Sequence, residues 1–340
     1  MPRIINGCWQ LSEGHGAGLA GNEEVNHHLT ALAQAGFSVF DCADIYTGVE
    51  TRLGSFLAAY ARRFGRARMR RLRIHTKFVP DLEALPRITR DYVARIIDRS
   101  LMRLRLDRLD LVQFHWWDFG IPGYVETARW LQDLQRAGKI RNLGVTNCDV
   151  PHLKTLVDEG IPVVANQVQY SLLDHRPERE MADFCLRKGI HLLCYGALAG
   201  GFLSERYWHM PRPETPLANR SLVKYMLIIE AFGGWPLFCE LLGALKEVAG
   251  KHGVGIANAA TAYILAKPAV AAVIVGTRNA SRLEDNRRSL GLVLDASDRR
   301  KIETVLDKRK GPRGDVFGLE REKGGPHAAI MKTDLNRDRP

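Results

Sequence analysis

The feature that most constrains the fold is a repeated alternation of short apolar segments with longer amphipathic ones. Eight short segments are rich in Val, Ile and Leu, and each is followed by a segment with helical signals. They span residues 4–10, 37–43, 72–78, 109–115, 140–146, 163–169, 191–196 and 269–276. Apolar strands that alternate with helices are typical of a parallel sheet covered by helices. Eight such units favour a closed (β/α)8 TIM barrel, an α/β fold, over an open sheet.

Local signals support the helices between these strands. Thr89 and Asp91 are suited to open a helix whose apolar positions follow a three-to-four spacing. Asn22, followed by two glutamates, is predicted to cap an earlier helix. Three glycines that precede strands are predicted to end helices, and they are Gly36, Gly138 and Gly189.

The barrel is predicted to form a single domain over residues 1–307. The longest interval between strands runs from Ala197 to Lys267, after the seventh strand, and begins with a proline-rich stretch. This interval is predicted to contain a long loop insertion. The C-terminal tail, residues 308–340, is rich in Gly, Pro and charge, and is predicted either to cover part of the barrel or to be flexible.

A glycine-rich stretch near the N-terminus offers a different fold. Gly16, Gly18 and Gly21 match the G-x-G-x-x-G pattern of a dinucleotide-binding turn, and Asp41 follows at a suitable distance. In a Rossmann fold the glycine turn follows its strand directly, but here Ser12 intervenes and the expected helix begins after Gly21. We therefore interpret the glycines as a loop at the top of the barrel.

Composition predicts a cytoplasmic protein. The chain shows no secretory signal pattern and no apolar segment long enough to span a membrane. The six cysteines are scattered and form no C-x-x-C pair, which indicates reduced thiols and no metal site.

The net charge of +11 depends largely on one segment, residues 62–73, which holds seven arginines and no acid. We expect it to be a solvated loop at the bottom of the barrel, and a docking surface for an acidic partner is the alternative. A nucleic-acid partner is not expected, because aromatic residues are not interleaved with the arginines.

Four residues with chemically useful side chains lie at or just after the carboxyl ends of strands, where the active sites of such barrels lie. They are Asp41, Tyr46, Lys77 and His115. Reduction of a carbonyl by hydride needs an acid that protonates the oxygen, and Tyr46 can serve because a nearby ammonium, Lys77, favours its phenolate. Asp41 would keep Lys77 charged, and His115 would donate a hydrogen bond to the substrate oxygen.

The motifs around these residues resemble those of the aldo-keto reductase family. FDCADIY is similar to the family's D-x-A-x-x-Y segment, and HTKF and LDLVQFH to the segments that carry its lysine and histidine. LGVTN, ANQVQY, CYGALAGGFL and VIVGTRNASRLEDN resemble its cofactor-binding segments. The resemblance covers residues 3–307 approximately, and it implies the barrel, the catalytic tetrad and a nicotinamide cofactor.

The resemblance also implies a set of cofactor-binding residues. This set is Trp9, Asp41, Thr146, Asn147, Gln167, Tyr195, Gly196, Leu198, Gly200, Gly276, Arg278, Arg282, Asp285 and Asn286. Gly276 stands where many members have a lysine, but Arg278 and Arg282 supply positive charge suited to a 2′-phosphate. NADPH is therefore the expected cofactor, and use of NADH stays open.

The substrate pocket is expected to be lined by Trp9, Tyr46, His115 and Trp116. Indole walls favour an apolar or aromatic carbonyl compound, or the flat face of a sugar. The predicted function is NADPH-dependent reduction of a small aldehyde or ketone. The alternative is a nicotinamide-nucleotide-sensing subunit with little turnover on the same barrel. The sequence does not determine the oligomeric state.

Overall fold

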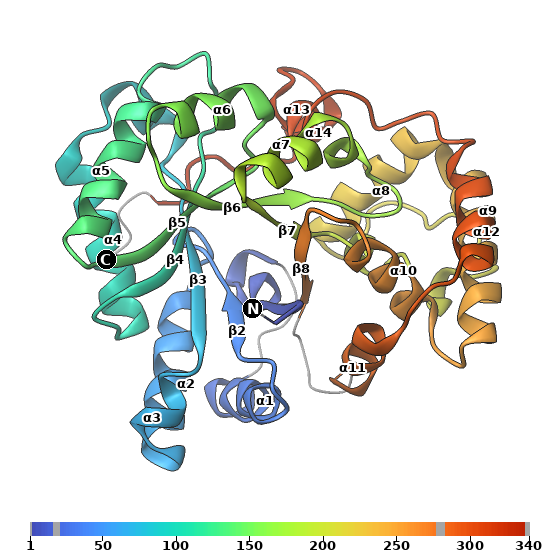
Figure 1. Ribbon diagram of the computed structural model, residues 1–340, viewed down its shortest axis with the longest axis horizontal. Coiled ribbons are helices and arrows are strands. Elements are labelled where there is room, and N and C mark those ends of the chain that lie inside the picture. Colours follow the sequence, from blue (N-terminus) through green and yellow to red (C-terminus); the bar gives the residue numbers. More distant parts are fainter. Residues whose placement is uncertain (1, 16–20, 277–282, 337–340) are drawn as a thin grey trace.

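The eight apolar segments form one closed parallel barrel in the computed structural model, which describes residues 2–15, 21–276 and 283–336 (Figure 1). The strands are β1 (Ile4–Gly7), β2 (Val39–Asp41), β3 (Arg73–Phe78), β4 (Leu109–Phe114), β5 (Ile140–Thr146), β6 (Val163–Gln169), β7 (His191–Tyr195) and β8 (Val270–Gly276). Each strand pairs with the next, and β8 closes the barrel on β1 through the pairs from Ile4–Val273 to Gly7–Gly276. The predicted fold class is confirmed.

Helices surround the strands on all sides (Figure 1). They are α1 (Asn22–Gln34), α2 (Val49–Phe64), α3 (Arg66–Met69), α4 (Arg90–Leu104), α5 (Tyr124–Arg136), α6 (Val150–Asp158), α7 (Glu180–Lys188), α8 (Arg220–Phe232), α9 (Gly234–Lys251), α10 (Ile256–Leu265), α11 (Leu283–Gly291), α12 (Ala296–Leu306), α13 (Gly318–Arg321) and α14 (Pro326–Ala329). Short 3₁₀ turns lie at Trp9–Leu11, Glu13–His15, Leu82–Arg87, Arg176–Glu178, Ala199–Gly201 and Glu205–Tyr207.

The predicted helix boundaries hold in most places. Thr89 caps α4 by accepting a hydrogen bond from the Tyr92 amide at 3.2 Å, and the predicted apolar face of α4 is buried at Val93, Ile96 and Ile97. Asn22 was expected to cap α1, but the cap is Gly21 and Asn22 is the first helical residue. The Asn22 side chain instead accepts a hydrogen bond from Arg52 at 3.0 Å, so it links α1 to α2.

The barrel interior has an apolar floor and a polar upper layer. Side chains in a strand alternate between its two faces, so every second residue points inward. The floor consists of Ile5, Val39, Leu111, Ala165, Leu193 and Ala272. Two positions further along the same strands come Gly7, Asp41, Gln113, Gln167, Tyr195 and Ile274. The polar residues of this upper layer therefore gather at the carboxyl ends of the strands.

The interval after β7 is an insertion, as predicted, but most of it is helical. Packing of α10 against β8 makes α10 the helix of the regular repeat, and α8 and α9 are additional. Among the described residues no single helix has the length and apolar composition of a membrane span. Only α8 and α9 together meet that test, and the chain bends by 93° between them.

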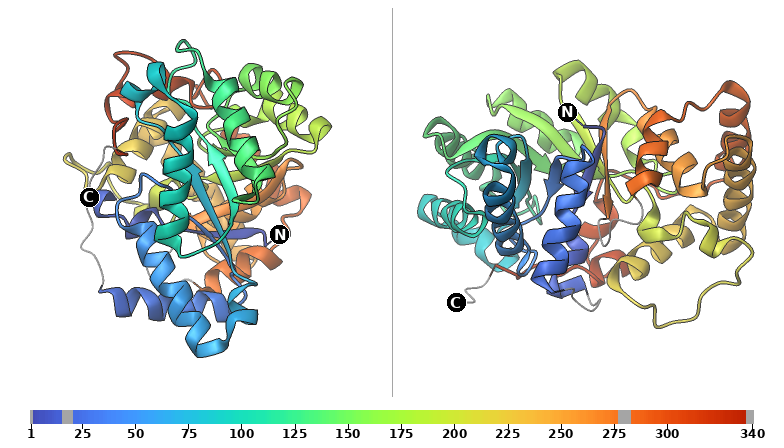
Figure 2. Two further views of the ribbon diagram at one scale, coloured as in Figure 1. Left: turned by 90° about the vertical axis from the view of Figure 1, so that its left-hand side faces the viewer. Right: turned by 90° about the horizontal axis from the view of Figure 1, so that it is seen from below.

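The tail crosses the end of the barrel opposite the α2–α3 tip (Figure 2). It begins with a backbone hydrogen bond from the Lys310 amide to Phe232 at 2.8 Å. Near its end, Asn336 is buried, and its side chain donates to Asp44 at 2.8 Å and to the Val79 carbonyl at 2.6 Å. The tail is thus attached both to the insertion and to the loops that follow β2 and β3.

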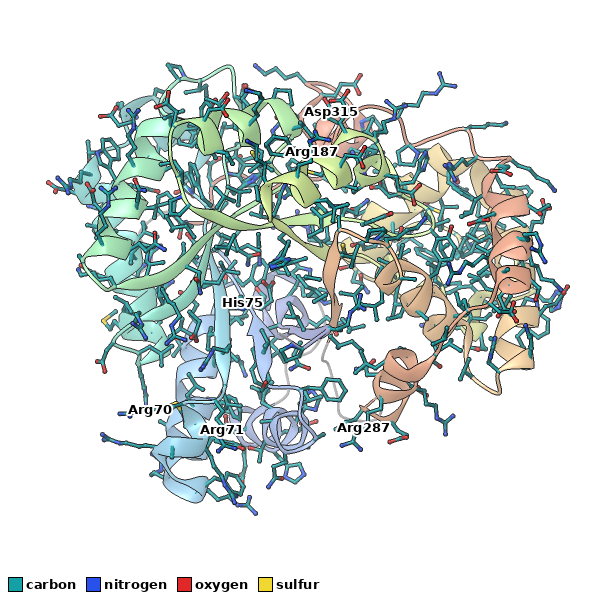
Figure 3. All side chains as sticks on the ribbon, viewed as in Figure 1. Arg70, Arg71, His75, Arg187, Arg287 and Asp315 are labelled. Atoms are coloured by element: carbon teal, nitrogen blue, oxygen red, sulfur yellow. The ribbon has the colours of Figure 1, made fainter. Side chains whose placement is uncertain are left out.

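The arginine-rich segment is helical, not a loop. Its first residues form the last turn of α2, Gly65 breaks the helix at φ 87°, and α3 follows. Figure 3 shows Arg70 and Arg71 beside α3, on the side of the molecule away from Asp315 of the tail. The segment leads into the N-terminal end of β3, so it lies at the bottom of the barrel, as predicted.

Candidate active site

Asp41 and Lys77 form a buried ion pair at the carboxyl ends of β2 and β3. Lys77 Nζ donates to Asp41 Oδ2 at 2.7 Å and to the Cys42 carbonyl at 2.8 Å. Their side chains are 5% and 6% exposed, so the pair is shielded from water. Burial by itself would lower the pKa of Lys77, but the Asp41 carboxylate more than offsets this and raises it. Lys77 is therefore charged at neutral pH.

Tyr46 lies against this pair. Lys77 Nζ is 5.1 Å from the centroid of the phenol ring, and the Trp9 ring packs on Tyr46 with centroids 4.8 Å apart. The sequence predicted a lowered pKa for Tyr46. Burial instead raises the pKa of Tyr46, and the opposing effects of the Lys77 charge and its hydrogen bond only partly offset this. The phenol keeps its proton at neutral pH.

Two glutamines, of which sequence analysis found only one, hold the other oxygen of Asp41. Gln113 Nε2 donates to Asp41 Oδ1 at 2.9 Å, and Gln167 Nε2 donates to the same atom at 2.7 Å. Gln167 Nε2 also donates to Gln113 Oε1 at 2.8 Å. Gln113 was missed, although it lies two residues before His115 and so faces the interior with it. The carboxylate is thus held from both oxygens.

His115 is buried at the end of β4 in one definite tautomer. Its Nδ1 lies 3.2 Å from the Thr146 carbonyl oxygen, which can only accept, so the hydrogen bond requires the proton on Nδ1. Burial, reinforced by the charge of Arg321, lowers the pKa of His115 to about 3. The neutral ring then carries its lone pair on Nε2.

This tautomer changes the expected role of His115. Its Nε2 is buried and has no hydrogen-bond partner among the residues that the structure describes. In the neutral ring this atom accepts a hydrogen bond. The predicted donation from His115 to the substrate oxygen therefore does not fit the geometry, because a second proton on this ring is strongly disfavoured. Nε2 is instead suited to accept from a hydroxyl group.

The two tryptophans after His115 take opposite sides of the chain. Trp116 was expected to line the substrate pocket, but it is 2% exposed and its indole donates to the Ile121 carbonyl at 3.0 Å, within the packing around β4. Trp117 packs on the His115 ring with centroids 4.4 Å apart. Strand alternation continues past the end of β4, so Trp117, and not Trp116, lies on the same side of the chain as His115.

Residues predicted for the nicotinamide converge beside Asp41. Tyr195 Oη donates to Asn147 Oδ1 at 2.9 Å, and Thr146 Oγ1 donates to the Gln167 carbonyl at 3.1 Å. Neither Asn147 Nδ2 nor Gln167 Oε1 forms a hydrogen bond within the described residues. One amide donor and one amide acceptor thus remain, which complements a carboxamide.

The predicted pyrophosphate segment forms a tight turn after β7. Gly196 and Gly200 have φ values of 74° and 65°, and a Cβ on Gly196 would lie 2.4 Å from Tyr225 Oη. Both positions therefore require glycine. Leu198 lies between them, directly before the turn Ala199–Gly201. Their backbone amides lie at the carboxyl end of a strand, where phosphate sites of such barrels are found.

The predicted adenosine segment is described only in part. Gly276 ends β8 and is exposed, and Asp285 and Asn286 lie in α11. Arg278 and Arg282 lie outside the described residues, as do Gly16 and Gly18 of the N-terminal stretch.

The tail and the insertion contribute residues that sequence analysis missed. The Phe317 ring lies 5.4 Å from the His115 ring, and Lys224 Nζ of α8 lies 5.0 Å from the centroid of Tyr195. Arg321 donates to the backbone carbonyls of Trp116, after β4, and of Asn147, after β5. No local motif marks these residues, because their proximity to the site depends on long-range packing.

The closed barrel with polar residues at its mouth defines the (β/α)8 class of fold, and comparisons with known proteins identify the family. The model of the Aldo/keto reductase family matches residues 3–307. Pyridoxal reductase, chloroplastic, from Arabidopsis thaliana is 30% identical over 83% of this chain and 76% of its own length. Aldo-keto reductase yakc [NADP(+)] from Schizosaccharomyces pombe is 26% identical over 98% of this chain and 95% of its own length.

A solved structure supports the same assignment. A thermostable aldo-keto reductase in complex with the inhibitor epalrestat matches with a TM-score of 0.70 and 25% identity, over 90% of this chain and 95% of that chain. The chain belongs to the aldo-keto reductase family. It is an enzyme, and members of its family use nicotinamide cofactors.

Proposed function

We propose that the protein reduces an aldehyde or ketone to an alcohol with NADPH, and that Tyr46 supplies the proton. The observation that carries this proposal is the position of Lys77, whose ammonium is 2.7 Å from the Asp41 carboxylate and 5.1 Å from the centroid of the Tyr46 ring. This arrangement joins an acid to a fixed positive charge at the end of the barrel where such active sites lie.

The residues at the barrel mouth fit a nicotinamide cofactor, which when bound supplies hydride. Asn147 Nδ2 and Gln167 Oε1 are suited to its carboxamide, and the Tyr195 ring is suited to stack on the nicotinamide. The turn at Gly196 and Gly200 is suited to the pyrophosphate. For the 2′-phosphate that distinguishes NADPH from NADH, we propose Arg278 and Arg282, on chemistry alone. The remaining proposed cofactor contacts are Trp9, Asp41, Thr146, Leu198, Gly276, Asp285 and Asn286.

Each side chain of the site has a separate role in the proton transfer. Because burial raises the pKa of Tyr46, its Oη holds a proton until the substrate oxygen becomes negatively charged. The phenolate that remains is stabilised by the Lys77 ammonium, and Asp41 keeps that ammonium charged and oriented. Trp9, Trp117 and Phe317 surround the reacting groups with aromatic surface, which suits a small apolar or aromatic carbonyl compound.

The redox state of the six cysteines indicates the cellular compartment of the protein. Each is a free thiol, and all but Cys239 are buried. Free thiols are typical of a reducing compartment, and we propose a cytoplasmic location.

The decisive experiment replaces Tyr46 by Phe. We expect reduction of a panel of small aldehydes, followed by loss of NADPH absorbance, to fall by about 100- to 10,000-fold, because the acid is removed. Binding of NADPH, measured by fluorescence titration, should persist, since Tyr46 is not among the proposed cofactor-binding residues. Turnover by the unsubstituted enzyme no faster than by Tyr46→Phe would favour the nucleotide-sensing alternative.

A further inference from the structure

Asp44 connects the two loops that lie beside Tyr46 and Lys77. It stands two residues before Tyr46, in the loop after β2, and its Oδ1 accepts a hydrogen bond from the Ile45 amide at 2.9 Å. Its Oδ2 accepts from the amide of Val79, two residues after Lys77, at 3.0 Å. Asp44 is 4% exposed, so water does not compete for these bonds. One carboxylate therefore joins the backbone beside the acid to the backbone beside the ammonium.

Asn336, the last residue that the structure describes, strengthens this connection from the tail. Its Nδ2 donates to Asp44 Oδ2 at 2.8 Å and to the Val79 carbonyl at 2.6 Å, so one amide group spans both loops. Its backbone amide donates to Asp81 Oδ1 at 2.7 Å. Arg99 of α4 donates to the side-chain oxygen of Asn336, and also to its backbone carbonyl at 3.4 Å. The end of the described tail is therefore inserted between these loops and α4.

The contacts around Asn336 fit the amide of asparagine specifically. Asn336 is 5% exposed, and each of its backbone and side-chain polar groups has a hydrogen-bond partner. Its NH2 group lies between two acceptors, and its oxygen lies beside a cation. An aspartate would lack the donor and an apolar side chain would lack both groups, so either would leave buried polar atoms unpaired.

We propose that Asn336 is a positioning residue for the reduction. Acting through Asp44, it fixes the loop of Tyr46 relative to the strand end that carries Lys77. The Lys77 ammonium is 5.1 Å from the centroid of the Tyr46 ring, and a small shift of either loop changes this separation. A displacement of about 1 Å at reacting groups can cost about 100-fold in rate. This inference rests on the proposed reductase function.

A single turnover of the full-length enzyme tests the inference. Enzyme preloaded with NADPH is mixed with the aldehyde of the panel that it reduces fastest. Burial raises the pKa of Asp44 to about 7, so the reaction is run at about pH 9, where this carboxyl is ionised. We expect Asn336→Ala to slow the oxidation of NADPH by about 10- to 100-fold. The dissociation constant of NADPH should change by less than about twofold, because Asn336 bonds to none of the proposed cofactor-binding residues.

The solvent isotope effect separates positioning from a structural role. A misplaced Tyr46 slows proton transfer more than hydride transfer, so the ratio of the rates in H2O and D2O should rise in Asn336→Ala. A protein that is only less stable would lose rate without a change in this ratio. Lys332→Met, at an exposed position of the same tail, is the control and should leave both the rate and the ratio unchanged.

Asp44→Asn tests the same connection from the loop after β2, and it decides the question if Asn336→Ala does not fold. It should slow the turnover and raise the isotope ratio in the same way. The double variant should be no more than about twofold slower than the slower single variant, because both residues act through one connection. An unchanged rate in either single variant, a slower rate with an unchanged isotope ratio, or fully additive losses would overturn the inference. If the unsubstituted enzyme reduced no carbonyl compound, the proposed function itself would fail.

Discussion

Burial sets the protonation state of the residues around Tyr46. It raises the pKa of the phenol and lowers that of His115 to about 3. It would also lower the pKa of Lys77, but the partner Asp41 reverses that shift. At neutral pH the site therefore holds a protonated phenol, a neutral imidazole and a charged ammonium. The sequence predicts the nearby cation, but the loss of water around Tyr46 follows only from packing.

The buried neutral His115 should make stability depend on pH. Its folded pKa of about 3 lies below the ordinary value of 6.5, so the unfolded chain binds more protons as the pH falls. The neutral ring makes its full contribution to the free energy of unfolding above pH 6.5, and this contribution is lost as the pH falls below that value. At pH 5 the loss amounts to about 2 kcal/mol.

His115→Gln should remove that part of the pH dependence. Chemical denaturation at pH 7.5 and pH 5.0 gives the change in unfolding free energy for each protein, and the change should be smaller in the variant by about 2 kcal/mol. The exposed His209→Gln is the control and should follow the unsubstituted protein. If the unfolding free energy of His115→Gln changed with pH as much as that of the unsubstituted protein, His115 would not titrate as its burial implies.

Strand direction decides which elements contribute to the site. The carboxyl ends of β2, β3 and β4 carry the tetrad or lead into it, whereas the N-terminal end of β3 carries the arginine-rich segment of α2 and α3. Strand β3 has six residues, and at about 3.3 Å per residue its ends are separated by more than a Debye length of about 8 Å. The arginines therefore lie too far from the mouth to act on a nucleotide there.

Neutralising the arginines at the bottom of the barrel should leave cofactor binding unchanged. For Arg62, Arg63, Arg66 and Arg68 together replaced by Gln, the dissociation constant of NADPH should change by less than about twofold at 0.15 M salt. Arg282→Ala is the contrasting variant and should weaken NADPH more than NADH. A tenfold loss of NADPH affinity in the quadruple variant would show that the cofactor binds near the bottom of the barrel and not at its mouth.

At the scale of the whole molecule, the C-terminal tail packs back against the barrel mouth through buried contacts. Glu320 contacts Arg176 at 3.2 Å and Lys224 at 3.4 Å, and Arg176 forms a bidentate pair with Asp174. Arg176, Asp174 and Glu320 are almost fully buried. These contacts tie the tail to the loop after β6 and to α8 of the insertion. We propose that residues 308–336 fold with the barrel as one unit.

Glu320→Gln should therefore destabilise the whole protein. Removing one partner of a buried ion pair costs about 3–5 kcal/mol. Because Arg176 keeps Asp174, we expect about 1–3 kcal/mol here. Chemical denaturation measures the loss, and the transition should stay a single one. Glu322→Gln, at an exposed position of the same tail, should cost less than about 0.5 kcal/mol. No loss in Glu320→Gln would show that the tail is held by other contacts.

The sequence by itself determined the barrel, its eight strands and the residues at their carboxyl ends. These depend on local patterns: apolar segments, helix caps, and ionisable residues next to strand ends. Strand alternation alone could also have predicted that Trp117, and not Trp116, lies on the side of His115. Only the tertiary structure decided the protonation of Tyr46 and His115 and the arrival of Phe317, Lys224 and Arg321 at the mouth. Burial and contacts between distant segments depend on how the closed chain packs, and no local pattern encodes them.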